Sequence, residues 1–364
     1  MDTLLLTPGP LTTREETRLA MLRDWGSRDE AFIALTAEMR RRLLAVANAA
    51  DTHVAVPLQG SGTFIVEATV GTLVGPEDKL LVLVNGAYGE RIAAIARRMG
   101  RAVETLIWDE TAPVDPLRLR AALAADPAIS HVAAVHCETT TGLLNPLAGI
   151  AAMVAGAGRK LLVDAMSSFG ALPLDLSALP AAAVMASSNK CLEGVPGLGF
   201  ALIEKQVLIA SHGNSPSVSF DLHEQWRGFE GNGQWRFTPP VQVAAALVRA
   251  LRLLEAEGGP AARLARYAEN CRILVDGMAR LGFPPLLDRA LQAPVIATFR
   301  HPENRPFAFE RFYRSLAARG FVIYPGKLTL VESFRIGCIG AVEPADMHRL
   351  LAAVEDIMEN RHAA

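Results

Sequence analysis

The stretch that decides the fold spans residues 160–199 and reads KLLVDAMSSFGALPLDLSALPAAAVMASSNKCLEGVPGLG. It contains two continuously apolar runs, 160–164 and 181–187, of the kind that forms strands covered on both faces of a sheet. Asp164 closes the first run, and Lys190 follows the second just before a glycine-rich segment. Ligands of parallel α/β sheets bind at the carboxyl ends of the strands, which is where both charged side chains are expected.

Asp164 and Lys190 together suit one pyridine cofactor, pyridoxal 5'-phosphate. A lysine amine can form a Schiff base with the cofactor's aldehyde, and a carboxylate can keep the ring nitrogen protonated as an electron sink. A lone lysine is more often a solvated surface charge, but Lys190 lies between a buried-looking run and a flexible segment. The pair therefore predicts a cofactor-dependent enzyme in which both residues are catalytic and bind the cofactor.

The first part of the chain alternates apolar runs with helical stretches. Strands are predicted at 54–58, 79–84, 102–108, 131–137, 160–164, 181–187 and 199–204, and helices at 15–23, 30–47, 63–74, 87–99, 116–125 and 146–157. Alternation on this scale predicts an α/β fold with a mainly parallel seven-stranded sheet, which forms a large cofactor-binding domain at 17–255. An N-terminal arm at 1–16 is expected to pack with the small domain or with a partner subunit.

The pattern changes after Pro239 and Pro240. Two long helices are predicted at 241–257 and 260–281, followed by shorter elements at 295–299, 307–319, 321–324, 333–336 and 344–360. This predicts a smaller α+β C-terminal domain at 256–364.

Composition excludes several classes of protein. The net charge of −2 over 364 residues leaves no basic surface for nucleic acid. The four cysteines are scattered without a C-x-x-C pair, which argues against a disulfide framework and a zinc site and fits a reducing compartment. Neither a signal peptide nor an apolar stretch of roughly 18 residues is present. We expect a cytoplasmic protein without bound metal or membrane contact.

Three further segments offer groups that suit a phosphorylated cofactor. Gly60, Ser61, Gly62 and Thr63 join a predicted strand to a helix, where free N–H groups and the helix dipole favour an anion such as a phosphate. A plain turn is the alternative, and the third glycine of a dinucleotide fingerprint is missing. Tyr88 could stack on the cofactor ring or simply be a packed aromatic residue.

Thr139 and Arg335 complete the candidate site. Thr139 follows a predicted strand and is placed to bring its hydroxyl near the cofactor ring. The preceding H-x-E triplet at 136–138 lacks the P-C-x-x-C partner of the zinc deaminases, so a metal site is not predicted there. Arg335 lies in an apolar run of the smaller domain, where it forms either an ion pair with a carboxylate or a bidentate clamp on an acidic substrate group.

These residues resemble a known family, the class V aminotransferases of fold type I, which depend on pyridoxal phosphate. The resemblance covers essentially the whole chain and is carried by residues 6–10, 21–29, 60–63, 138–142, 187–194, 235–238, 321–327 and 334–340. The strings at 24–29 and 187–194 resemble most closely the branch that transaminates 2-aminoethylphosphonate with pyruvate. Such a reaction gives phosphonoacetaldehyde and L-alanine and belongs to phosphonate catabolism.

The resemblance implies a role for each candidate residue. Lys190 would hold the cofactor's aldehyde and Asp164 its ring nitrogen, while Thr139 would contact the ring. The phosphate would be held by Ser61, Gly62 and Thr63, and by Thr238 of the neighbouring subunit in a homodimer. Arg335 would bind the acidic group of the substrate.

Two positions depart from the family's pattern and affect the expected specificity. Cys338 stands where asparagine is usual, and Glu193 where glutamine is usual. Alternative activities are therefore an alanine–glyoxylate or serine–pyruvate aminotransferase, or an aminophosphonate lyase of the same fold. A non-catalytic binding module is a further alternative, but the presence of both Lys190 and Asp164 argues against it.

Overall fold

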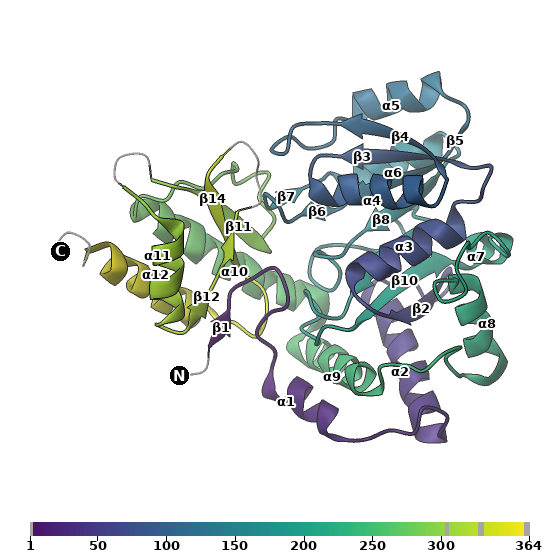
Figure 1. The fold of residues 1–364 in the computed structure, drawn as a ribbon, viewed down its shortest axis with the longest axis horizontal. Coiled ribbons are helices and arrows are strands. Elements are labelled where there is room, and N and C mark those ends of the chain that lie inside the picture. Colours follow the sequence, from purple (N-terminus) through teal and green to yellow (C-terminus); the bar gives the residue numbers. More distant parts are fainter. Residues whose placement is uncertain (1–2, 303–305, 327–330, 360–364) are drawn as a thin grey trace.

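The computed structural model describes residues 3–302, 306–326 and 331–359, which form a larger and a smaller lobe (Figure 1). The larger lobe is built on a seven-stranded sheet with the order β2-β10-β9-β8-β5-β3-β4. Its strands are β2 (His53–Gln59), β3 (Lys79–Val84), β4 (Ala102–Ile107), β5 (Ile129–Val135), β8 (Lys160–Asp164), β9 (Ala183–Ser187) and β10 (Leu198–Glu204). Only β10 runs antiparallel to its neighbours, so the predicted α/β fold with a mainly parallel seven-stranded sheet is confirmed.

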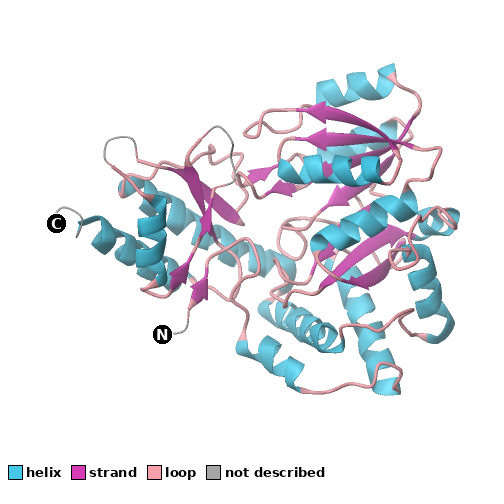
Figure 2. Cartoon of the chain, in the orientation of Figure 1, coloured by secondary structure: helices cyan, strands magenta, loops and turns pink. Residues whose placement is uncertain are grey.

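Helices cover both faces of this sheet (Figure 2). Every residue of β9 is buried, and successive side chains of a strand point to opposite faces, so both faces are covered at the centre of the sheet, whereas the edge strand β4 is partly exposed. The covering helices are α2 (Glu30–Val46) on β2, α3 (Gly62–Leu73) on β9 and β10, α4 (Ala87–Arg98) on β3, β4 and β5, and α6 (Leu147–Gly156) on β8, with α5 (Pro116–Ala125) packed on α6. The apolar runs seen in the sequence are the direct result of this double burial.

The smaller lobe has a core of its own. A three-stranded antiparallel sheet has the order β11 (Ile296–Arg300), β14 (Ser333–Gly337) and β13 (Tyr324–Pro325). The helices of this lobe are α10 (Gly259–Arg280), α11 (Phe309–Ala317) and α12 (Pro344–Glu359), and α9 (Val241–Glu257) leads into it from the larger lobe. Phe283, Phe299, Phe312 and Phe334 are fully buried here and pack ring against ring.

The N-terminal segment belongs spatially to the smaller lobe. The short strand β1 (Leu4–Leu5) pairs in parallel with β12 (Phe321–Val322), and Leu6 lies in the core of that lobe. The chain then passes between the lobes before α1 (Glu15–Leu19) and a 3-10 turn at Ala20–Leu22 bring it to the larger lobe (Figure 1).

The structure differs from the sequence prediction at one strand end and in two helices. The strand predicted at 131–137 ends at Val135, and Cys137–Glu138 pairs instead with Leu143–Leu144 as the hairpin β6–β7. Two helices were not predicted, α7 (Lys205–Ala210) and α8 (Leu222–Asn232). The last residue expected for the final helix, Asn360, and Lys327 of the 321–327 motif lie outside the described residues.

Within the described ranges, no helix combines the length and the apolar character needed to cross a bilayer.

Candidate functional site

One cavity brings together most of the residues predicted from the sequence. Its volume is about 370 Å³, and it lies where β2, β8 and β9 end. The predicted residues that line it are Ser61, Gly62, Thr63, Tyr88, Asp164 and Lys190. Sequence analysis missed several other lining residues, among them Arg91, Met166, Ser187 and Asn189. The predicted grouping of Asp164 and Lys190 at the carboxyl edge of the sheet is thus what the structure contains.

The turn at 60–63 provides an anion site at one end of this cavity. Helix α3 begins at Gly62, and the Ser61 side chain does not cap it. Gly62 lies so close to Met166 that an added Cβ would be 2.5 Å from the Met166 sulfur. The Arg91 guanidinium donates a hydrogen bond to the Thr63 hydroxyl over 3.2 Å, which adds a full positive charge beside the helix N-terminus. A phosphate group fits this combination of helix dipole and cation.

Asp164 ends the central strand of the sheet in a fully buried position. Burial raises the pKa of its carboxyl to about 6, while the Met166 N–H and the charges of Arg91 and Lys190 act in the opposite direction. The Met166 N–H donates to Oδ1 over 2.9 Å. A buried carboxylate of this kind is stabilised by a cationic partner, and a protonated ring nitrogen in the cavity would be such a partner.

Lys190 faces the cavity from the loop that follows β9, and the N-terminal segment covers it. Its Nζ donates to the Pro8 carbonyl over 2.7 Å and lies 3.4 Å from the Gly9 carbonyl. Gly9 has φ of 110°, and an added Cβ would lie 2.6 Å from Lys190 Cδ, so only glycine allows this approach. The Pro-Gly-Pro run at 8–10 was the only sequence signal for this contact.

Tyr88, Thr139 and Arg335 form a chain of contacts that leads from the cavity into the smaller lobe. The Thr139 hydroxyl donates to the Tyr88 hydroxyl over 3.3 Å, and the Thr139 carbonyl accepts from Arg335 Nη1 over 2.9 Å. Arg335 is 1% exposed, and its Nε donates to the Pro325 carbonyl. Within the described residues no carboxylate forms an ion pair with it, so the alternative of a structural salt bridge is not supported. Thr139 and Arg335 themselves do not line the cavity.

Glu138 lies beside these contacts, whereas the last predicted residue, Thr238, does not. Burial raises the pKa of Glu138 to about 7, although Thr140 and the Tyr88 N–H donate hydrogen bonds to its carboxyl group. Glu138 thereby binds the first turn of α4, which carries Tyr88. Thr238 lies apart from the cavity in this chain, exposed in the segment between α8 and α9.

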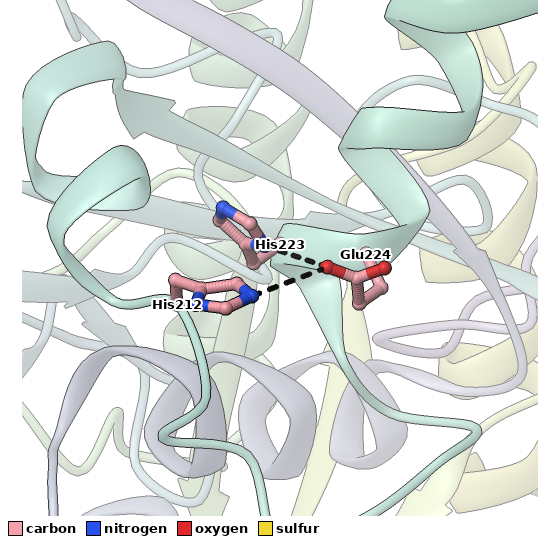
Figure 3. A group of neighbouring side chains, drawn as sticks. All are labelled: His212, His223 and Glu224. Carbon is pink, nitrogen blue, oxygen red and sulfur yellow. Dashed lines mark hydrogen bonds and ion pairs between the residues drawn. The ribbon is translucent and has the colours of Figure 1, made fainter.

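A second cluster of titratable side chains lies away from the cavity, between the end of α7 and the start of α8. Figure 3 shows the His212 and His223 rings next to each other, both facing the same oxygen of the Glu224 carboxyl group, with nitrogen–oxygen distances of 4.0 and 3.1 Å. The three side chains have the donor types of a metal site. The Arg227 guanidinium, however, lies 3.6 Å from the same Glu224 oxygen, so a permanent cation already neutralises the carboxylate.

Comparison with known proteins adds the following findings. Residues 17–327 match the model of the family described as aminotransferase class-V. The chain is 51% identical over 358 residues to 2-aminoethylphosphonate–pyruvate transaminase of Pseudomonas fluorescens, covering 98% of this chain and 97% of the relative. It is 54% identical over 355 residues to 2-aminoethylphosphonate–pyruvate transaminase 2 of Burkholderia lata, covering 98% and 94%. The crystal structure of alanine–glyoxylate aminotransferase from Nostoc sp. matches with a TM-score of 0.91 and 26% identity, covering 98% and 96%.

The buried carboxyl of Asp164 predicts a pH-dependent stability difference in the cofactor-free protein. Its pKa is about 6 when folded and 3.8 when unfolded, so ionising it opposes folding. The penalty is absent below about pH 4, grows between pH 4 and 6, and is complete above pH 6. The difference of about two units between the folded and unfolded pKa corresponds to about 3 kcal/mol at most. Asp164→Asn avoids the penalty, and its melting temperature should exceed that of wild type at pH 7.5.

Thermal unfolding of both cofactor-free proteins between pH 4.5 and 8 measures this difference. Glu138 titrates in both proteins; the Asp164 charge is one of the causes that raise its pKa, so its penalty is smaller in the variant and acts in the same direction as the predicted difference. Asp51→Asn, at an exposed position, is the control for the substitution itself. A melting-temperature difference that stays constant across this range, or wild type the more stable at pH 7.5, would contradict the prediction.

Proposed function

The chain belongs to the class-V aminotransferases, and we propose that it transaminates 2-aminoethylphosphonate with pyruvate, giving phosphonoacetaldehyde and L-alanine. The observation that carries this proposal is the meeting of Lys190, Asp164 and the 60–63 turn around one cavity. Identity above 50% over 98% of the chain to relatives named for this reaction supports the choice of substrates.

The cofactor proposed for the cavity is pyridoxal 5'-phosphate, because each of its groups has a matching partner there. Lys190 supplies the amine for the aldehyde, and Asp164 the carboxylate for the ring nitrogen. Ser61, Gly62 and Thr63 would hold the phosphate, and Tyr88 would stack on the ring. When bound, pyridoxal phosphate supplies an electron sink for the negative charge that develops on the substrate carbon.

The protein's own residues position the reactants and move one proton. With its amine free, Lys190 Nζ would take the proton from the substrate carbon as general base and deliver it as general acid to the carbon on the cofactor side of the C–N bond. The carbonyls of Pro8 and Gly9 lie against Nζ and limit where the amine can point. Asp164 remains ionised beside a positive charge, which keeps the ring nitrogen protonated while the substrate carbon becomes negative.

Arg335 is the proposed binding group for the acidic end of the amine substrate. Its guanidinium is buried, carries a full charge and is already oriented by the carbonyls of Pro325 and Thr139. A phosphonate has three acceptor oxygens and up to two negative charges, which suits a guanidinium fork. A carboxylate would also suit it, so the choice between an aminophosphonate and an amino acid requires measurement.

The proposed assembly is a homodimer in which Thr238 reaches the phosphate of the neighbouring subunit's cofactor. The exposure of Thr238 and its distance from the cavity of its own chain support this arrangement. All four cysteines are buried and none forms a disulfide, which supports a reducing, cytoplasmic location.

Lys190→Ala should abolish turnover, because Lys190 is the one lysine among the described residues that line the cavity, and its amine is needed to bind the aldehyde and move the proton. Wild-type protein should be yellow and lose this colour on borohydride reduction, whereas the variant should bind cofactor without a covalent link. Peptide mapping of the reduced wild type should find the adduct on Lys190. An adduct on Lys160 or Lys205 would overturn the assignment.

Mixed dimers test whether Thr238 acts across the subunit interface. A hybrid of Lys190→Ala and Thr238→Val subunits has one site with both changes and one with neither if Thr238 serves the neighbour. Each hybrid dimer should then contain one wild-type site of its two, with wild-type cofactor affinity measured by absorbance titration. If Thr238 serves its own chain, each site carries one change and no wild-type site forms. A monomer with full activity would also refute the proposal.

Arg335→Ala should lower kcat/KM for 2-aminoethylphosphonate by about tenfold to a hundredfold, because a charge-assisted hydrogen bond contributes roughly 1.5–3 kcal/mol. Cofactor absorbance should be unchanged, and Arg335→Lys should recover only part of the loss. Wild type should convert 2-aminoethylphosphonate with pyruvate far faster than L-alanine or L-serine with glyoxylate. The opposite ranking would favour an alanine–glyoxylate activity, and absence of any turnover would favour a lyase.

A further inference from the structure

Glu193 stands out in the loop that carries Lys190 because it combines an unusual backbone with a buried charge. It is 2% exposed, and its φ of 58° is one of two positive values among the described residues that are not glycine. The left-handed region costs such a residue roughly 1–2 kcal/mol, so other contacts must hold it there. Its N–H donates to the Lys190 carbonyl, and the Gly194 N–H to the Ser188 carbonyl, which closes the loop around Lys190.

The Glu193 side chain is held by helix α10 of the smaller lobe. Its Oε1 accepts hydrogen bonds from Arg266 Nη2 over 2.7 Å and from the Tyr267 hydroxyl over 2.6 Å. Arg263 Nε lies 3.7 Å from the same oxygen, and Arg263 Nη1 donates to the Cys191 carbonyl over 2.7 Å. Helix α10 therefore grips the loop at two points, one and three residues beyond Lys190.

The same face of α10 also holds the segment that follows Arg335. Arg266 Nη1 donates to the carbonyls of Gly340 and Val342, and the Gly340 N–H donates to the Tyr267 hydroxyl. Asn270 donates to the carbonyls of Cys338 and Val342. Arg266 and Tyr267 thus touch both the Lys190 loop and the end of the strand that carries Arg335.

The charges of this cluster balance without the cofactor. Glu257, at the junction of α9 and α10, accepts from both Arg263 and Arg266 over 2.6–2.9 Å. Two guanidinium groups of α10 are thereby matched by two carboxylates in a region that is largely closed to solvent, and a third, Arg14, lies 3.9 Å from Glu193 Oε2 and pairs also with Glu343. A buried charge that loses its partner is strongly unfavourable. The ion pairs and hydrogen bonds to Glu193 therefore hold its side chain in one position.

We propose that Glu193 is a positioning residue that fixes Lys190 relative to Arg335 across the boundary between the two lobes. The proposal rests on the proposed function, because only a reaction that uses both residues needs their separation held constant. Proton transfer by Lys190 depends on sub-ångström placement, and a displacement of about 1 Å can lower a rate a hundredfold.

Glu193→Gly is the informative variant, because glycine adopts the observed backbone without strain and removes only the side chain. We expect kcat for 2-aminoethylphosphonate to fall at least about tenfold while cofactor affinity changes little. Glu193→Gln keeps an acceptor oxygen for Arg266 and Tyr267 and should stay within about threefold of wild type. Glu257→Gln removes the same charge from the same two arginines but leaves the Lys190 loop untouched, so it is the matched control.

Hydrogen exchange gives a readout that does not depend on turnover. In the full chain, with and without added pyridoxal phosphate, Glu193→Gly should raise amide exchange at 188–194 and at 338–342 but not in the central sheet. If wild type converts no amine, the proposed function fails, yet this measurement still decides whether Glu193 anchors the loop. Equal effects of Glu193→Gly and Glu257→Gln, or wild-type exchange and kcat in Glu193→Gly, would overturn the proposal. Tyr267→Phe, which removes one of the contacts, replaces Glu193→Gly if that variant does not fold.

Discussion

The constraint on which the site depends is the burial of one carboxylate at the end of the central strand. Asp164 ends β8, which has three strands on each side, and it is closed off from solvent. Ionising a carboxylate there is unfavourable unless positive charge lies close by. Arg91 comes from α4 and Lys190 from the loop after β9, so the local charge balance is assembled from separate elements around the strand end. A cofactor with a protonated ring nitrogen would add the positive charge that Asp164 needs. The buried carboxylate, which destabilises the cofactor-free protein, would thus favour binding of the cofactor.

The large-scale features could be predicted because they follow from local patterns. Seven apolar runs gave the seven strands, and Asp164 and Lys190 at the ends of two of them gave the cavity. The hairpin β6–β7 was missed because its strands have two residues each, and periodicity needs a longer stretch. Arg91 was missed although its segment was recognised. Its role in the site comes from its hydrogen bond to Thr63 and its charge near Asp164, and both residues lie far away in the sequence. The cover of Lys190 by Pro8 and Gly9 likewise joins distant parts of the chain, and the Pro-Gly-Pro run at 8–10 does not by itself specify its partner.

The two lobes contribute different parts of the chemistry. The larger lobe holds the groups proposed to bind and tune the cofactor, whereas the smaller lobe holds Arg335, which is proposed to recognise the substrate. The Thr139 carbonyl accepts a hydrogen bond from Arg335, which is one contact between the lobes. Helix α10 makes a second, because Arg266 donates both to Glu193 in the Lys190 loop and to the Gly340 carbonyl in the segment after Arg335. Specificity can therefore change through residues of the smaller lobe, including Cys338, without altering the electronic environment of the cofactor. This division suits a family in which one cofactor chemistry serves many amines.

The pairing of β1 with β12 has a consequence for the order in which the protein is completed during synthesis. Leu4 leaves the ribosome early, but its partner Phe321 is among the late residues to be made. The segment that follows Leu4, with the Pro8 and Gly9 carbonyls over Lys190, has no place to dock until then. A nascent chain can form the seven-stranded sheet and expose a reactive lysine before this cover exists. The anchoring of this cover therefore depends on residues that are made late, and truncation before Phe321 would remove the partner of β1 even where the sheet is intact.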